Sequence, residues 1–108
     1  MKINLLDTHT VLWFLSGNDN LSNSARTRIE QKKAINFISI GSLWEMAIKI
    51  SLNKLKLKFP FSDFKSILED NGFIVLSIEM VDIEMVAKMP FHHRDPFDRI
   101  IISQAINN

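Results

Sequence analysis

The chain has 108 residues, 46% of them hydrophobic, which favours one domain spanning residues 1–108 around a single core. With 23% charged residues and no cysteine, the composition excludes a disordered polyelectrolyte and a disulfide-stapled miniprotein, and it favours a cytoplasmic location. A net charge of +1 cannot hold a polyanion by itself, so any nucleic-acid binding must come from local basic patches and metal ions. The N-terminal apolar run meets an acid at Asp7, too early for a signal peptide or a membrane span.

The first half of the chain predicts two strands and three helices. Ile3 to Leu6 is a continuous apolar run that ends in Asp7-Thr8, the pattern of a buried strand followed by a helix N-terminus. A capping candidate at Ser22 and apolar residues at a spacing of four indicate a surface helix. In chain order we expect a strand over 3–6, a short buried helix over 11–15, a surface helix over 22–33, a strand over 34–39 and a helix over 41–52.

The second half is expected to add one strand and three helices. Lysine alternates with apolar residues over 54–59 before Pro60, which indicates an extended segment with one basic face, or a helix tail running into one. Asp95 and Pro96 suit the N-cap and N1 positions of a last helix. The expected elements are a helix over 61–68 stopped by Asn71-Gly72, a strand over 73–78, a helix around 83–87, a loop over 89–94 and a final helix with its buried body over 100–106.

The alternation of strands and helices defines the expected fold class. It favours an α/β protein in three layers, α/β/α, with a central parallel sheet built from right-handed crossovers and covered on both faces. In open parallel sheets, ligands gather beyond the carboxyl ends of the strands. Residues that follow a strand are therefore the first candidates for a functional site.

Two acids stand out in the first half of the chain. Asp7 follows the first predicted strand, and its alternative role is to cap the next helix. Glu45 is the only acid between Asn36 and Ser51, and it shares a polar stripe with Ser42 and Lys49 on an otherwise apolar helix. That stripe favours a polar cavity, while the alternative is a Ser42 to Glu45 capping box with a Glu45 to Lys49 ion pair.

Two more acids open the last predicted helix. Asp95 and Asp98 occupy its N-cap and N3 positions, where the helix dipole stabilises carboxylates. Helix capping readily explains one of these two acids but not both. Asp98 is the better candidate for a metal ligand, because Asp95 serves as the N-cap. His92 and His93 are adjacent in a predicted loop and would point apart, which disfavours a histidine metal site.

Carboxylates are the main candidate functional groups in this sequence. Hard oxygen ligands without cysteine suit Mg²⁺ or Mn²⁺ rather than Zn²⁺. Such ions activate a water and neutralise charge on phosphoryl oxygens. The acids therefore indicate phosphate chemistry.

At these residues the sequence resembles a known family. The segments that carry the resemblance are Leu5-Leu6-Asp7-Thr8-His9, Ser42-Leu43-Trp44-Glu45-Met46-Ala47-Ile48-Lys49 and His93-Arg94-Asp95-Pro96-Phe97-Asp98-Arg99, followed by Ile102-Ser103-Gln104-Ala105. In this order they are similar to the PIN-domain toxins of the VapC type, from bacterial and archaeal toxin-antitoxin pairs.

The resemblance implies a fold, an activity and partners. It implies a PIN-like α/β fold and a metal-dependent endoribonuclease that hydrolyses RNA, uses Mg²⁺ or Mn²⁺, forms homodimers and is silenced by a cognate antitoxin. By position, Asp7, Glu45 and Asp98 match the family's metal-binding acids, and Asp95 is an accessory acid. The RNA-binding rim is expected to comprise Lys49, Lys54, Lys56, Lys58, Arg94 and Arg99.

One departure from the family pattern affects these expectations. Family members usually continue past the last helix into an edge strand with a fourth acidic position, whereas this sequence stops at Asn107-Asn108. We therefore expect a C-terminally shortened fold, a dimer or strand-exchanged oligomer, and weakened activity. The main alternative is a degenerate PIN-like module that pairs with an antitoxin or with itself. A receiver-like signalling domain is disfavoured, because the sequence lacks that family's acid pair and late lysine.

Overall fold

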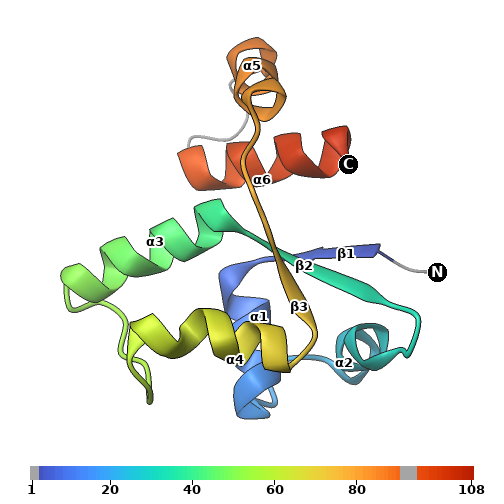
Figure 1. Ribbon diagram of the computed structural model, residues 1–108, viewed down its shortest axis with the longest axis vertical. Coiled ribbons are helices and arrows are strands. Elements are labelled where there is room, and N and C mark those ends of the chain that lie inside the picture. The colour runs from blue at the N-terminus through green and yellow to red at the C-terminus, as the bar shows by residue number, and fades with distance from the viewer. Residues whose placement is uncertain (1–2, 91–94) are drawn as a thin grey trace.

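The computed structural model describes residues 3–90 and 95–108, and it is an α/β protein with a parallel sheet (Figure 1). The described residues form three strands in the order β1-β2-β3, where β1 is Ile3–Leu6, β2 is Ile35–Ser39 and β3 is Phe73–Leu76. Leu6 pairs with Ile38, and Ser39 pairs with Leu76. Because all strands are parallel, their carboxyl ends share one edge of the sheet, and the predicted fold class is confirmed.

Helices lie on two sides of the sheet. They are α1 (Thr8–Ser16), α2 (Asn23–Glu30), α3 (Ile40–Ser51), the 3-10 turn η1 (Phe61–Asp63), α4 (Phe64–Asp70), α5 (Met80–Lys88) and α6 (Pro96–Asn107). The chain crosses from β1 to β2 and from β2 to β3 in the same direction, so right-handed crossovers place their helices on one face. Figure 1 shows α1, α2 and α4 below the strands and α5 and α6 above them, which is the predicted three-layer arrangement.

Several element boundaries follow from local chemistry, and some differ from prediction. Ser22 caps α2 by accepting a bond from the Ala25 N–H at 3.1 Å, as its position predicts. Gly17 ends α1 with a left-handed φ of 67°, a conformation that glycine adopts without steric cost. The predicted strand over 73–78 stops at Leu76, because the chain then leaves the sheet toward α5.

The segment over 54–59 has no regular secondary structure. Asn53 has a left-handed φ of 57° and separates it from α3, so the helix-tail alternative is wrong. Leu55 and Leu57 are half-buried against the core, whereas Lys56 and Lys58 are exposed. The alternating sequence therefore produces the predicted basic face.

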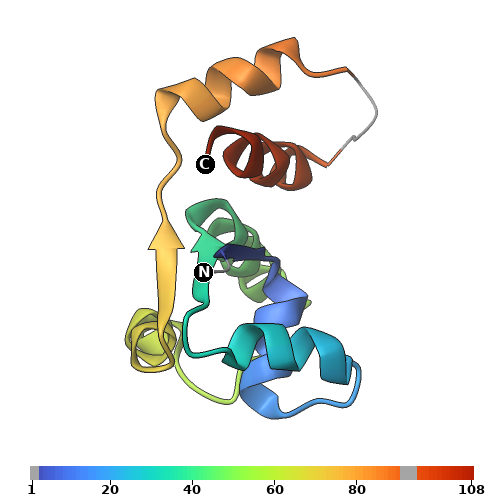
Figure 2. The ribbon, with the colours of Figure 1, turned by 90° about the vertical axis from the view of Figure 1, so that its right-hand side faces the viewer.

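The hydrophobic core lies on one face of the sheet. Ile38 and Phe73 point to the face covered by α1 to α4, and Val11, Met46 and Leu68 pack with them. On the other face Ile3 is 62% exposed and Ile74 is 49% exposed. The α5 and α6 pair on that side is attached mainly by the contact of α6 with α3, and it stands away from the lower helices in Figure 2. The radius of gyration is 14.3 Å, above the value of about 13 Å for a compact chain of this length.

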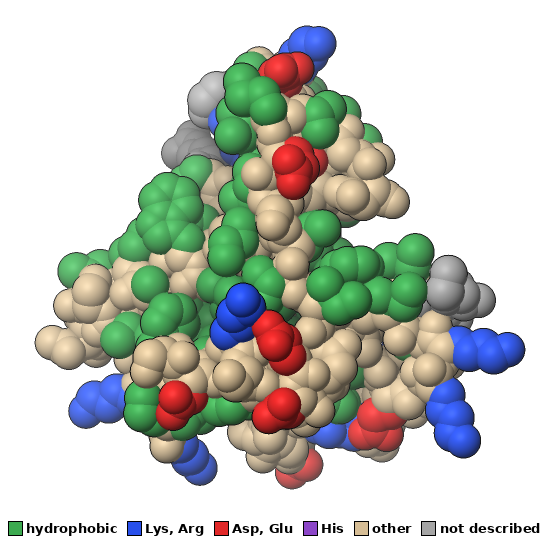
Figure 3. All heavy atoms as spheres, in the orientation of Figure 1, with side chains coloured by type: hydrophobic (Ala, Val, Ile, Leu, Met, Phe, Trp, Pro, Cys, Tyr) green, Lys and Arg blue, Asp and Glu red, His purple; other side chains and the backbone are tan. Residues whose placement is uncertain are grey.

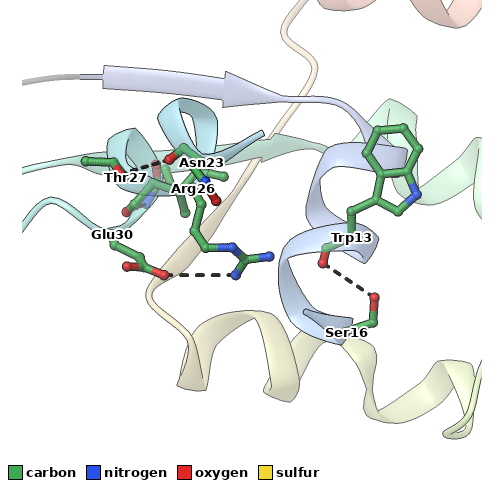
Figure 4. A network of polar contacts seen from close by, with 8 residues as sticks. Trp13, Ser16, Asn23, Arg26, Thr27 and Glu30 are labelled. Carbon is green, nitrogen blue, oxygen red and sulfur yellow. Dashed lines mark hydrogen bonds and ion pairs between the residues drawn. The ribbon is translucent and has the colours of Figure 1, made fainter. Parts of the chain in front are cut away.

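A cation–π contact joins the first two helices, and Figure 4 shows Arg26 extending from α2 toward α1. Arg26 extends from α2 over the ring of Phe14 in α1, with its guanidinium carbon 5.2 Å from the ring centre. Its Nη1 atom also lies 3.9 Å from the Glu30 carboxylate. The cation over the aromatic face therefore helps to hold α2 beside α1.

No helix within residues 3–90 and 95–108 combines the length and the apolar composition needed to cross a membrane.

Replacing Met46 by alanine tests the position of the core. Met46 is fully buried, so we expect the Met46→Ala change to lower the free energy of unfolding by about 2–5 kcal/mol through lost burial and a residual cavity. Met80 is 65% exposed, and Met80→Ala should alter it by less than about 0.5 kcal/mol. Urea denaturation of both variants gives the comparison, and equal losses would place the core elsewhere.

Candidate active site

Asp7 lies directly after β1, at the carboxyl edge of the sheet. Its Oδ1 atom accepts a hydrogen bond from the Thr10 N–H at 2.8 Å, which makes Asp7 the N-cap of α1. The residue is exposed, and its second carboxylate oxygen is not used by this cap. Capping therefore accounts for one oxygen of Asp7 and is compatible with a ligand role for the other.

The first turns of α1 and α3 touch each other beside Asp7. Asp7 and Ser39 follow the paired residues Leu6 and Ile38, so they leave neighbouring strands at the same level. The hydroxyl of Thr8, the first residue of α1, donates to the Ser42 carbonyl at 3.4 Å. Ser42 lies in the first turn of α3, so this bond places the start of α1 next to the helix that carries Glu45.

The N-cap of α3 is Ser39, not Ser42. The Ser39 hydroxyl accepts a bond from the Gly41 N–H at 2.9 Å, and α3 begins at Ile40, one residue before the predicted start. Ser42 is fully buried, and its hydroxyl has no hydrogen-bond partner within the described residues. The alternative of a Ser42 to Glu45 capping box is therefore wrong, and Glu45 is free of that role.

Glu45 lies one turn after Ser42 on the same side of α3. Its side chain is 22% exposed, and its Oε2 atom is 3.5 Å from the Lys49 ammonium, as the spacing of four predicts. A partly exposed pair of this kind contributes only about 0.3–0.5 kcal/mol to stability. The pair therefore keeps a cation beside Glu45 without holding its carboxylate firmly.

The N-terminus of α6 carries the other two acids. The Oδ1 atom of Asp95 accepts bonds from the N–H groups of Phe97 at 2.8 Å and Asp98 at 3.4 Å, with Pro96 at the first helical position, so the predicted cap is confirmed. Asp98 is exposed at the third position of the helix. Asp95 is thus occupied as a cap, and Asp98 is the acid of this pair with the freer side chain.

α6 crosses α3 in close contact. The rings of Phe97 and Trp44 meet edge to face at 5.1 Å. A Cβ atom at Gly41 would lie 3.2 Å from Cγ2 of Ile100, so glycine allows the two helices to approach this closely. Trp44 precedes Glu45 and Phe97 precedes Asp98, so this crossing brings the two acid-bearing turns to the same junction.

The structure places the predicted acids on neighbouring elements without joining them into one ligand group. Among residues 3–90 and 95–108, no set of three or more His, Cys, Asp or Glu side chains is arranged to hold a metal ion. The donor chemistry of Asp7, Glu45 and Asp98 suits Mg²⁺ or Mn²⁺, but their arrangement does not form the site. His92, His93 and Arg94 lie outside the described residues.

The basic residues predicted to bind RNA lie in separate parts of the structure. Lys49 lies beside Glu45, whereas Arg99 donates through Nη2 to the Val86 carbonyl at 2.9 Å and links α6 to α5. The lysines of the 54–59 segment lie beyond the C-terminal end of α3. Two of them, Lys56 and Lys58, line a groove of about 360 Å³ together with the later part of α1. Lys49 is thus placed next to a candidate acid.

Two apolar grooves were not anticipated from the sequence. One of about 820 Å³ lies between α3, α4 and β3, and its lining includes Leu43, Trp44 and Ile74. Another of about 240 Å³ lies between α3, α5 and α6 and includes Phe97. Asp7, Glu45 and Asp98 are not among the lining residues of either groove.

The sequence pattern of the PIN domain matches residues 5–108, which include all four candidate acids. The chain belongs to the PIN domain family. PIN domains are typically metal-dependent nucleases, and they are often toxins of toxin-antitoxin systems. No curated protein and no solved structure matches the chain.

The roles of Asp95 can be separated by two substitutions in this PIN domain. Asparagine caps helices as well as aspartate does, so Asp95→Asn should leave the free energy of unfolding nearly unchanged. Asp95→Ala removes the acceptor for the Phe97 and Asp98 N–H groups and should lower it by about 0.5–2 kcal/mol. Chemical denaturation of both variants provides the measurement. Equal losses in the two variants would show that the charge of Asp95, rather than its cap, is required.

Proposed function

We propose that this PIN domain is a metal-dependent endoribonuclease that hydrolyses RNA phosphodiester bonds, and that it acts as a VapC-type toxin of a toxin-antitoxin pair. The proposal depends mainly on two contacts of α3, the helix that carries Glu45. One is with the start of α1, which follows Asp7, and the other is with the start of α6, which carries Asp98. Thr8 of α1 bonds to Ser42, and Phe97 of α6 packs on Trp44, so Glu45 lies between the elements of Asp7 and Asp98.

Asp7, Glu45 and Asp98 are the proposed metal ligands and catalytic acids. Their oxygen-only donors suit Mg²⁺ or Mn²⁺, and such an ion would supply an activated water and neutralise charge on the scissile phosphate. Asp95 holds the first turn of the helix that carries Asp98. Because the described residues do not form the ligand group, the three carboxylates must approach one another before they can share an ion.

RNA is held, in this proposal, by local positive charge near the acids. Lys49 neighbours Glu45, and the N-termini of α1 and α6 add the positive ends of two helix dipoles at the same edge of the sheet. Arg99 belongs to the same helix start as Asp98. Arg94, which lies outside the described residues, is included in the proposed rim by its position in the sequence. Lys54, Lys56 and Lys58 extend it past the end of α3.

The groove between α1 and the 54–59 segment suits an inhibitor protein. It is lined by Leu12, Trp13 and Leu57 and edged by Lys56 and Lys58. Apolar side chains of a partner could fill it while acidic residues meet the lysines. We therefore propose this groove as the place where a cognate antitoxin binds.

An exposed apolar stripe on α3 suits a second copy of the chain. Ile40, Trp44, Ile48 and Leu52 recur at a spacing of four, and all four are exposed. Figure 3 shows hydrophobic side chains gathered over α3 and next to β3. Apolar surfaces of this kind mark interaction sites, and one stripe can pair with its own copy about a two-fold axis. We propose a homodimer through this face.

A non-cleaving binding module is the second candidate. It is favoured by one observation: Glu45 is paired with Lys49, and the described acids do not form a metal site. In that case the groove between α1 and the 54–59 segment and the apolar stripe on α3, and not the acids, would carry the function.

Cleavage assays with matched acid variants test the nuclease proposal. Purified protein should cut a panel of structured RNAs in Mg²⁺ or Mn²⁺, and Asp7→Asn, Glu45→Gln or Asp98→Asn should each reduce the rate at least about 100-fold, because each removes a metal ligand. Asp70→Asn changes an exposed acid at the end of α4 and serves as the control. Cleavage that survives all three site substitutions would show that these acids do not carry the reaction. Folded protein that never cleaves RNA would favour the binding module.

Sedimentation of two isoleucine variants tests the dimer. The unaltered chain should be a dimer at tens of micromolar, and Ile48→Glu should convert it to a monomer because a charge in the apolar stripe would lose its hydration on pairing. Ile106→Glu, at an exposed position near the end of α6, should leave the dimer intact. A monomeric unaltered chain, or equal effects of the two substitutions, would contradict the proposed interface.

A further inference from the structure

The second half of α6 carries buried polar side chains that the proposed chemistry does not use. Ser103 and Gln104 are fully buried, and Asn107 is half-buried. The Ser103 hydroxyl donates to the Asp82 carbonyl at 2.6 Å, and the Asn107 amide donates to Asp82 Oδ1 at 3.0 Å. Both bonds join α6 to α5, so they stabilise the pair of helices without fixing its position on the sheet.

Gln104 makes a different connection. Its Nε2 atom donates to the Ser77 carbonyl at 3.1 Å and to the Leu76 carbonyl at 3.4 Å. Leu76 is the last residue of β3, and it pairs with Ser39 at the end of β2. The Gln104 amide therefore ties α6 to the carboxyl edge of the sheet, the edge at which Asp7 lies.

The bonds of Gln104 constrain how α6 is turned about its axis. Phe97, Ile100 and Gln104 recur at spacings of three and four, so they share the face that meets α3 and β3. Asp98 lies six residues before Gln104, about 120° around the helix and about 9 Å along it. Once Gln104 is bound to the sheet, the direction of the Asp98 side chain is set.

We infer that Gln104 is a positioning residue for the nuclease reaction: by binding the carbonyls at the end of β3, it tethers α6 to the carboxyl edge of the sheet and limits where Asp98 can lie when it approaches Asp7 and Glu45. The inference rests on the proposed nuclease function. A rotation of about 20° at a radius of about 6 Å would move a carboxylate by about 2 Å. Metal–ligand distances tolerate only about 0.2 Å, so the approach of the three carboxylates must end at a defined rotation of α6, and the bonds of Gln104 limit that rotation.

Stability alone is a weak explanation for an amide at this position. The Oε1 atom of Gln104 is buried and has no hydrogen-bond partner within the described residues. A buried polar atom without a partner opposes folding, and replacing a buried polar group with an apolar side chain of similar shape is often neutral or stabilising. The directional bonds to Leu76 and Ser77 are what an apolar side chain could not provide.

Asn36 offers a matched control for this inference. It is also a buried side-chain amide, and its Nδ2 atom donates to the Ile29 carbonyl at 2.9 Å, joining β2 to the end of α2. It lies near the start of β2, away from the carboxyl edge. Loss of Asn36 should therefore affect folding without moving α6.

The test compares Gln104→Met with Asn36→Leu by RNA cleavage and by Mn²⁺ binding in calorimetry. Gln104→Met should lower kcat at least about tenfold and weaken Mn²⁺ binding several-fold, with KM for RNA little changed, since it misplaces Asp98 and leaves the RNA-binding lysines alone. Asn36→Leu should lower the melting temperature at least as much as Gln104→Met does. Its kcat and Mn²⁺ affinity should stay within about twofold of the unaltered protein.

The outcomes distinguish the inference from the proposed function. Unaltered protein that neither cleaves RNA nor binds Mn²⁺ would overturn both. An active protein whose Gln104→Met variant keeps its kcat and Mn²⁺ affinity, or whose Asn36→Leu variant loses them equally, would overturn the role of Gln104 alone. If Gln104→Met does not fold, Gln104→Leu carries the same test, because leucine is also apolar and lacks the amide donor.

Discussion

The close approach of α6 to the first turn of α3 depends on the absence of a side chain at Gly41. A Cβ atom there would press against Ile100 and the Ser39 hydroxyl, each at 3.2 Å, and would push α6 outward. The edge-to-face contact of Trp44 with Phe97 forms at the same crossing. Because Glu45 and Asp98 are the next residues on the two helices, this one contact governs how near two of the candidate acids can come.

The two halves of the candidate site are held with unequal firmness. Asp7 and Glu45 belong to α1 and α3, which pack on the buried face of the sheet around Val11, Ile38 and Met46. Asp98 belongs to a pair of helices attached through α3 and through the bonds of Gln104 to the end of β3. Segments with few buried apolar contacts open at lower free energy than the core, so α6 is the element most able to change the spacing of the acids.

Helix capping explains the positions of some of the candidate acids without any ligand. Asp7 and Asp95 cap α1 and α6, and Asp98 lies in the first turn of α6, where the free N–H groups and the dipole favour negative charge. Glu45 is neither a cap nor a first-turn residue; it is paired with Lys49. These four carboxylates can therefore stand on helices that contact one another at little cost in stability.

The sequence by itself determined what depends on neighbours along the chain. The strand at Ile3–Leu6, the caps at Ser22 and Asp95 and the basic face of 54–59 all follow from short-range periodicity and capping, because those interactions span only a few residues. Only the tertiary structure decided that Ser39 rather than Ser42 caps α3, that α6 crosses α3 at Gly41, and that Gln104 binds the end of β3. It also left Asp7, Glu45 and Asp98 on adjoining helices without a shared site. These features depend on distances between segments far apart in sequence, which neither periodicity nor residue spacing encodes.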